Sequence, residues 1–329
     1  MDRMGRTHPG DERTELTMER EIIERNYDIA ENSIENYSER FFKNLDVSEK
    51  SFETYKKALK NFFLWLFDNG INQPKREDIK AYKDSLSAEK KSASTIQLYI
   101  TSVKMFFRFL DSEGLYEDVT RYVKNVSVDR TEHKRDSLSE KQAQELLASI
   151  PLFNEKGLRD YAIIRLMLTT GLRTIEVANT QIGDIKENSC GYVLYIQGKG
   201  HKEKDRFVKL MGKTFEAIRV YLERRATKEK LSPEAPLFVS ESNRGRTGIT
   251  SKSVSRICKE AMRKIGLDSD RLSAHSFRHT SATLNMLNGG TLEETQQLLR
   301  HSSINTTMIY LHDLDRMKNN SEGRLDSLL

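Results

Sequence analysis

The sequence predicts a mainly α-helical protein with a small antiparallel β-sheet, an α+β chain in two domains. Most segments carry apolar residues at helical spacing, and several of these segments end at a glycine. Two neighbouring segments, Cys190–Gln197 and Arg206–Leu210, have instead the composition of strands joined by a polar turn. The chain has 329 residues, and a single core stops growing near roughly 250–300 residues.

Residues 1–45 are predicted to form an acidic N-terminal extension, which becomes helical over the charged stretch Met18–Phe42. Residues 1–50 hold 8 Lys and Arg against 13 Asp and Glu. The remaining 279 residues hold 46 (54 − 8) against 36 (49 − 13). Many soluble proteins are mildly basic, but a basic body behind an acidic extension fits a polyanion as partner.

Residues 46–130 are predicted to form a helical domain and the linker after it. Three helices are expected, over Ser48–Gly70, Lys75–Ser87 and Ser92–Gly114. The first has one apolar stripe, made of Tyr55, Leu59, Phe62, Phe63 and Leu66. The linker that follows is polar and contains neither Gly nor Pro, so composition alone places the boundary near residue 131.

Residues 131–329 are predicted to form the second domain, mostly helical with one small sheet. The expected helices are Leu138–Ile150, Gly157–Gly171, Lys213–Thr227, Ile249–Gly266, Ser276–Gly290 and Thr291–His301. The strands Cys190–Gln197 and Arg206–Leu210 form a hairpin in this scheme. Residues 311–329 are a C-terminal tail, too short and polar to gain much by folding back on its own domain.

Several protein classes are excluded by the sequence. No apolar run reaches the ~18 residues of a membrane span, and the N-terminus has no apolar signal core. The two cysteines, Cys190 and Cys258, do not form a metal-type pair. These features predict a cytoplasmic protein that does not contact the membrane.

Four motifs in the second domain carry residues suited to chemistry. They are TTGLRTIEV with Arg173 and Glu176, QGKGHKEKDR with Lys199, AHSFRHTSAT with His275 and Arg278, and LLRHSSINTTMIYLH with His301 and Tyr310.

Each motif taken alone has a purely structural interpretation. Arg173 and Glu176 have the spacing of a helical ion pair, and lysines in a hairpin turn are usually solvated. His275 and His279 could share a helix face as metal ligands, but the glutamate of the H-E-x-x-H type is missing. A single tyrosine such as Tyr310 is usually a packing residue.

Together these motifs resemble the tyrosine recombinase (phage-integrase-type) family, and its Xer-like members in particular. The family pattern is the arginine of TGLR, a lysine in a GKG hairpin, H-x-x-R, and a histidine nine residues before a tyrosine. The matching residues occur here in the same order: Arg173, Lys199, His275, Arg278, His301 and Tyr310. The resemblance covers the chain from about residue 46, and its helical first domain is similar to the DNA-clamping core-binding domain of the family.

The resemblance implies a site-specific recombinase that cuts and rejoins double-stranded DNA through a 3′-phosphotyrosine intermediate, with Tyr310 as nucleophile. A phosphodiester under attack gathers negative charge, and the guanidiniums of Arg173 and Arg278 suit its non-bridging oxygens. The arginines then do the charge neutralisation that a divalent ion does elsewhere. No metal and no cofactor is therefore expected.

The other matching residues fit proton transfer and orientation. His275 is suited to act as base toward the tyrosine, and Lys199 to protonate the departing 5′-oxygen. His301 would donate a further hydrogen bond to the phosphate, and Glu176 would orient these groups from behind.

The resemblance also implies a homotetramer on two DNA sites and leaves open an accessory directionality factor. Integration and excision of a mobile element is the favoured role. Xer-type chromosome dimer resolution and DNA inversion are alternatives. A type IB topoisomerase and a DNA-binding regulator with a dead catalytic domain fit less well.

Two features depart from the family pattern. Arg300 stands before the second histidine, where the family usually has glycine. Glycine suits a left-handed turn, so either the loop carrying His301 differs or Arg300 adds a phosphate contact. Residues 1–45 match no standard arm-binding module.

Overall fold

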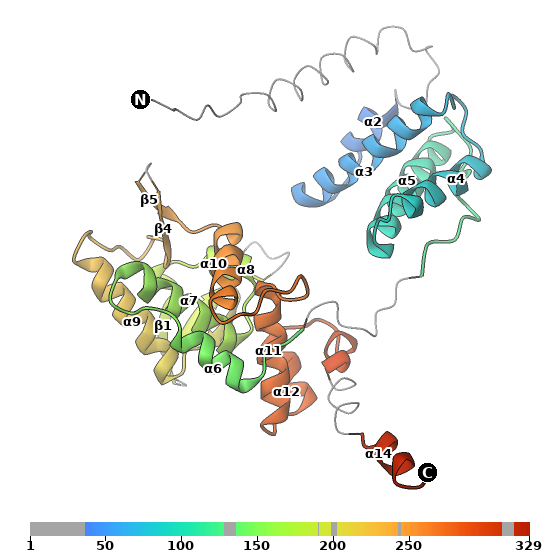
Figure 1. The fold of residues 1–329 in the computed structure, drawn as a ribbon. Coiled ribbons are helices and arrows are strands. Elements are labelled where there is room, and N and C mark those ends of the chain that lie inside the picture. The colour runs from blue at the N-terminus through green and yellow to red at the C-terminus, as the bar shows by residue number, and fades with distance from the viewer. Residues whose placement is uncertain (1–36, 128–135, 190, 199–202, 243–244, 311–318) are drawn as a thin grey trace, which may run out of the picture. The chain divides into compact units, whose positions relative to one another are not determined.

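The computed structural model describes residues 37–127, 136–189, 191–198, 203–242, 245–310 and 319–329 (Figure 1). The chain divides into two compact units, Met1–Asp129 and Arg130–Leu329. Four features predicted from the sequence lie wholly or mostly outside the described residues. They are the helix expected over Met18–Phe42, Cys190, Lys199 and the first part of the C-terminal tail.

The described part of the first unit is helical. Its helices are α2 (Ser38–Lys43), α3 (Glu49–Asp68), α4 (Arg76–Ala88) and α5 (Ala93–Ser112). The side chains of Ser48 and Ser92 cap α3 and α5 by accepting a backbone N–H three residues ahead. Helix α3 packs against α5 around a core rich in aromatic rings. The three predicted helices of this domain are confirmed.

Helix α7 (Glu155–Thr170) is the central helix of the second unit. Its buried apolar residues include the run Ala162, Ile163 and Ile164, so more than one face is covered. An α-helix that is apolar on several sides must be enclosed by other elements. Helices α9 (Gly212–Ala226) and α11 (Ala274–Leu287) provide this cover.

The second unit contains further helical elements. They are α6 (Glu140–Ala148), α8 (Thr174–Ala178), the 3₁₀ turn η2 (Ile182–Asp184), α10 (Ser251–Lys264), α12 (Leu292–Leu299) and α14 (Ser321–Asp326). Residues 305–310 are also helical. None of the described helices combines the length and apolar character that a bilayer crossing requires.

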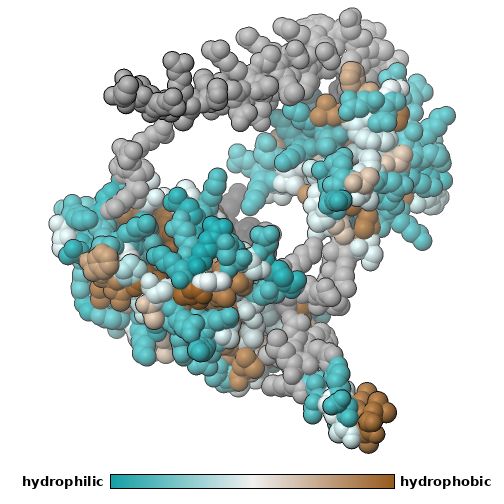
Figure 2. Space-filling view, in the orientation of Figure 1, coloured by the Kyte–Doolittle hydropathy of each residue, from teal (hydrophilic) through white to brown (hydrophobic). Residues whose placement is uncertain are grey.

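Helix α14 leaves its apolar side chains in solvent. Leu325 of α14 is 59% exposed, Leu328 just after the helix is 79% exposed, and no residue of α14 is buried. Figure 2 shows this apolar surface in brown at the C-terminal segment. Among the described residues, this segment therefore buries none of its apolar side chains.

Two small antiparallel sheets complete the second unit. Strands β1 (Ile185–Asn188), β2 (Gly191–Ile196) and β3 (Arg206–Lys209) pair in the order β1-β2-β3. Leu194 stands opposite both Ile185 and Val208 in this register. Strands β4 (Val239–Ser242) and β5 (Gly245–Gly248) form a separate hairpin. The predicted mainly α fold with antiparallel β-structure is confirmed.

The expectation of a single two-stranded sheet is wrong. Strand β1 reads IKEN, and strands β4 and β5 read VSES and GRTG, so none of them alternates apolar and polar residues. Their strand conformation comes from pairing with a neighbour, which period-two hydrophobicity cannot reveal.

The C-terminal ends of α7 and α12 meet, and both end in the left-handed region. Gly171, the C-cap of α7, has φ +61°, and Arg300, the C-cap of α12, has φ +55°. A Cβ atom built on Gly171 would lie 2.7 Å from Cδ2 of Leu299, the last residue of α12. Glycine is therefore required at position 171 for both its backbone conformation and its lack of a side chain.

Replacing Gly171 with Ala is expected to lower the free energy of unfolding by about 1–3 kcal/mol, because the methyl group clashes and φ is unfavourable. Denaturant titration of the full chain measures this change. Gly212→Ala is the matched control, since nothing lies within 4 Å of its Cβ position, and it is expected to change stability by less than about 0.5 kcal/mol. Equal stabilities for the two variants would contradict the proposed close approach.

Candidate active site

Residues from five separate segments line one cavity in the second unit, with a volume of about 400 Å³. Those that line it are Arg173, Glu176, Gly198, Arg206, His275, Arg278, Arg300, His301, Ser302 and Thr306. The structure thus brings together five of the residues singled out in the sequence. Lys199 lies outside the described residues, although Gly198 directly before it lines the cavity.

Arg173 and Glu176 are fixed to each other by the start of α8. Arg173 is the N-cap and Glu176 is the third helical residue. The Glu176 carboxylate accepts hydrogen bonds from the backbone N–H of Arg173 at 2.8 Å and from its Nη1 at 2.7 Å. Through these two bonds the Glu176 side chain satisfies the N–H group of the N-cap residue and sets the position of the Arg173 guanidinium.

Arg278 projects from α11 onto the ends of two other helices. Its Nη1 donates to the Gly171 carbonyl at 2.6 Å, and its Nη2 donates to the Leu299 carbonyl. The last carbonyls of a helix have no partner within the helix and carry partial negative charge, so a guanidinium suits this position. Burial, together with the charges of Arg173 and Arg300, lowers the pKa of Arg278 to about 9, which keeps it cationic at neutral pH.

Arg300 turns inward from the C-cap of α12. Its side chain is 8% exposed, and Nη2 pairs with Oε2 of Glu176 at 3.2 Å. Its Nη1 donates to the carbonyls of Thr170 and Leu298 at 3.1 and 2.7 Å. Despite the arginine, the loop keeps the left-handed conformation that glycine favours.

The Glu176 carboxylate therefore pairs with two guanidiniums in the cavity, those of Arg173 and Arg300. Burial by itself would raise the pKa of Glu176, but Arg300 and Arg173 hold it below its ordinary value. Counting Arg278 and Arg206, four positive charges line the cavity together with a single negative charge. The cavity is consequently suited to an anion.

His301 is held next to these arginines by its own loop. Its Nδ1 lies 2.9 Å from Oγ1 of Thr307. Burial, followed by the charges of Arg278 and Arg173, lowers the pKa of His301 to about 4, so the imidazole is neutral at neutral pH. When the Thr307 hydroxyl donates to Nδ1, Nε2 carries the proton and can donate to a ligand.

Tyr310 is 4% exposed and packs with Ala282 and Leu299. Its ring centroid is 5.3 Å from that of His279, which lies 4.9 Å from the ring of His275. Tyr310 does not belong to the residues found to line the cavity, yet it lies near enough to Arg278 to influence its pKa. The contact between His279 and Tyr310 was not foreseen from the sequence.

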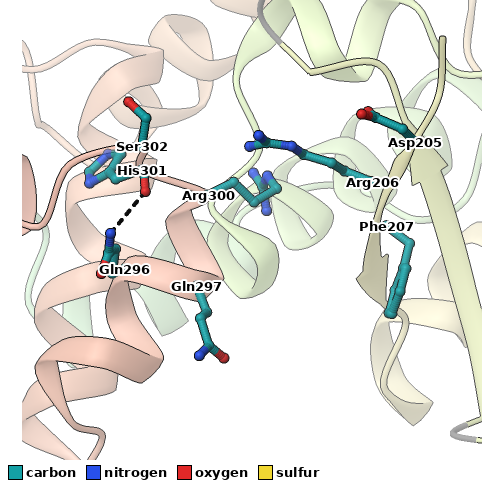
Figure 3. A pocket seen from close by; sticks show the side chains of 8 residues that line it. All are labelled: Asp205, Arg206, Phe207, Gln296, Gln297, Arg300, His301 and Ser302. Carbon is teal, nitrogen blue, oxygen red and sulfur yellow. Dashed lines mark hydrogen bonds between the residues drawn. The ribbon is translucent and has the colours of Figure 1, made fainter. Parts of the chain in front are cut away.

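A second cavity of about 500 Å³ opens beside the first. Figure 3 shows its eight lining residues, with Arg206 of β3 and Arg300 approaching one another from opposite sides. On the far wall, Nε2 of Gln296 donates to the carbonyl of His301 at 3.1 Å. Arg206 lines both cavities and was missed in the sequence, where only its place after the basic hairpin could have suggested it.

The His275 and His279 pair does not belong to a larger ligand set. Within the described ranges, no group of three or more His, Cys, Asp or Glu side chains is placed to hold a metal ion. Cys258 is buried, and burial raises the pKa of its thiol well above the ordinary value, so it remains a packing residue.

Sequence comparisons place this geometry in a known family. The profile of the phage integrase family matches residues 136–317, and that of the phage integrase N-terminal SAM-like domain matches residues 29–114. Tyrosine recombinase XerA of Pyrococcus furiosus is 32% identical over 250 residues, covering 76% of this chain and 80% of its own. Tyrosine recombinase XerD of Rhizobium meliloti is 30% identical over 262 residues, covering 77% and 81%.

Solved structures share the fold. XerH site-specific recombinase bound to a palindromic difH substrate aligns with a TM-score of 0.66 at 22% identity, over 87% of this chain and 84% of its own. The Tn1549 transposon integrase in complex with transposon right end DNA aligns with a TM-score of 0.62 at 18% identity, over 84% and 93%. The chain therefore belongs to the phage integrase family and is a tyrosine recombinase, an enzyme that breaks and rejoins DNA strands at specific sites.

Proposed function

We propose that the cavity binds the scissile phosphate of double-stranded DNA and that Tyr310 attacks it to form a 3′-phosphotyrosine bond. The observation that carries this proposal is the convergence of Arg173, Arg278 and His301 on one cavity beside the buried Tyr310. Six motif residues of a known pattern support it from the sequence. The phosphodiester bond breaks as the tyrosine bond forms, so the freed 5′-hydroxyl can later reverse the step on another strand.

The arginines stabilise the charge that develops on the phosphate. Arg173 is 28% exposed on its side chain, so its guanidinium is accessible from the cavity while Glu176 holds it. Arg278 presents a second, cationic guanidinium. Preorganised donors of this kind are worth roughly 3–4 kcal/mol each in the transition state, and they allow the reaction to proceed without a metal ion.

Histidine and lysine side chains complete the reaction. His275 is exposed at the N-terminus of α11 and is the proposed base for the tyrosine proton. Neutral His301 donates a hydrogen bond to a non-bridging oxygen. Lys199 is the proposed acid for the departing 5′-oxygen, and Glu176 orients Arg173.

Tyr310 has to leave its apolar packing for this attack. The tyrosine is followed directly by the C-terminal tail, 311–329, whose described part exposes its leucines. We propose that this tail docks on a neighbouring protomer in a tetramer bound to two DNA sites. A head-to-tail contact of this kind closes into a ring and would couple assembly to the position of the tyrosine.

The favoured biological role is integration and excision of a mobile element. The likeness in fold to a transposon integrase is compatible with it, and the acidic extension at residues 1–45 favours this role. Xer-type dimer resolution is the alternative, because the relatives described above include XerA and XerD. Mapping covalent adducts across the native genomic neighbourhood distinguishes the two roles.

Replacing Tyr310 with Phe is expected to abolish covalent attachment to a nicked half-site duplex, because only the nucleophilic oxygen is lost. Gel shift should give a half-site affinity within about twofold of wild type. The assay contains excess chelator and no nucleotide. Tyr192→Phe, a change on β2, is the matched control and should form adduct normally. A covalent band that persists in Tyr310→Phe would place the nucleophile elsewhere.

Arg173→Lys and Arg278→Lys are each expected to slow covalent adduct formation by about 10²–10³-fold, since an ammonium cannot reproduce the planar, paired donors. Single-turnover rates at saturating protein measure this loss. Arg219→Lys, an exposed arginine of α9, should cleave at the wild-type rate. Near-normal cleavage by either active-site variant would argue against phosphate binding by that arginine.

Deleting Arg316–Leu329 is expected to leave half-site binding intact but to weaken pairing of two sites and full strand exchange. Native gels and a two-site recombination assay measure the two effects separately. A full-length variant with Leu325, Leu328 and Leu329 changed to Ser tests whether the exposed leucines make the contact. Wild-type recombination and assembly by the truncated chain would show that the tail does not dock.

A further inference from the structure

Arg300 occupies a backbone conformation that disfavours it. Its φ is +55° and its ψ is +42°, and among the described non-glycine residues it shares a positive φ only with Lys90. An L-residue in this region pays a steric cost that glycine avoids. The side chain must therefore make interactions that compensate for it.

Those interactions join two parts of the active site. From the end of α12, the guanidinium reaches the last carbonyls of α7 and the Glu176 carboxylate of α8. It is 8% exposed, and Glu176 is 2% exposed. The residue directly after Arg300 is His301, so the arginine ties the histidine loop to the segment that carries Arg173.

The shared carboxylate explains why a second guanidinium is useful. A buried carboxylate that loses its only cationic partner is strongly destabilised. Arg173 is bound to Oε1 of Glu176 and Arg300 to Oε2. Because Arg300 holds Oε2, Glu176 keeps a second cationic partner when the Arg173 guanidinium also binds phosphate, and the Arg173 backbone N–H remains bound.

We propose that Arg300 is a positioning residue for DNA strand cleavage, which acts by sharing Glu176 with Arg173 and by anchoring the His301 loop to the end of α7. This inference rests on the proposed function of the cavity. It assigns Arg300 to the cleavage step, because its guanidinium is 8% exposed and shares Glu176 with Arg173.

The test compares single-turnover adduct formation and half-site binding for wild type, Arg300→Gly, Arg300→Lys, Glu176→Gln and the double variant Arg300→Gly/Glu176→Gln. Arg300→Gly is expected to slow cleavage by about tenfold or more with affinity changed by less than about twofold. Arg300→Lys keeps the charge and should cleave faster than Arg300→Gly. The double variant should cleave no more slowly than the slower single variant, because both changes remove the same interaction between Arg300 and Glu176.

Lys90→Gly is the matched control. It places glycine at the other left-handed position, which lies in the first unit. Cleavage should be unchanged, and the melting temperature should rise because glycine relieves the backbone strain at that position. Glycine also suits position 300, so the cleavage loss in Arg300→Gly should appear without a fall in melting temperature of more than a few degrees.

Several results would overturn the proposal. These are wild-type cleavage by Arg300→Gly, equal rates for the glycine and lysine variants, parallel losses of binding and cleavage, or multiplicative effects of the two single changes. Tyr310→Phe in the same assay tests the proposed function separately. If the Tyr310→Phe variant still formed the adduct, the assignment of Tyr310 as nucleophile would be wrong, whether or not Arg300 affected the rate.

Discussion

The candidate active site depends on the backbone carbonyls at the C-terminal end of α7, which have no hydrogen-bond partner within the helix. Gly171 ends this helix in a left-handed turn, and its carbonyl accepts hydrogen bonds from both Arg278 and Arg300. A helix end leaves several such oxygens without partners, and cationic donors are stabilised there. The central helix of the second unit therefore terminates where the arginines gather. The chain then turns directly into Arg173 and α8, which adds the third guanidinium to the same place.

The electrostatic balance of the cavity follows from this arrangement. Four guanidiniums and one carboxylate line the cavity, and this excess of positive charge can be neutralised by an anionic phosphate. The same excess, with burial, keeps His301 neutral while leaving it a hydrogen-bond donor. Because the arginines are tied to protein oxygens before any ligand arrives, little reorganisation is needed when charge develops.

Much of the helical fold was predictable because burial leaves a periodic pattern in the sequence. Helices α3, α5 and α7 carry apolar stripes and clear end signals such as Ser48 and Gly171. Strand β1 and the β4–β5 hairpin carry no such pattern, since their side chains are mostly polar and their conformation is set by the partner strand. The short helix α8 is also invisible to periodicity, because five residues do not complete two turns.

By itself the sequence determined which residue types are available for phosphate chemistry, because the order and local setting of Arg173, His275, Arg278, His301 and Tyr310 are features of the chain. The tertiary structure alone decided how they interact. It turned Arg300 inward onto Glu176, packed Tyr310 against His279, and added Arg206 to the cavity. These are contacts between residues far apart in the chain, and they depend on where helix ends meet. Local sequence patterns do not predict such contacts, since the pattern around each residue reflects only the helix or strand to which that residue belongs.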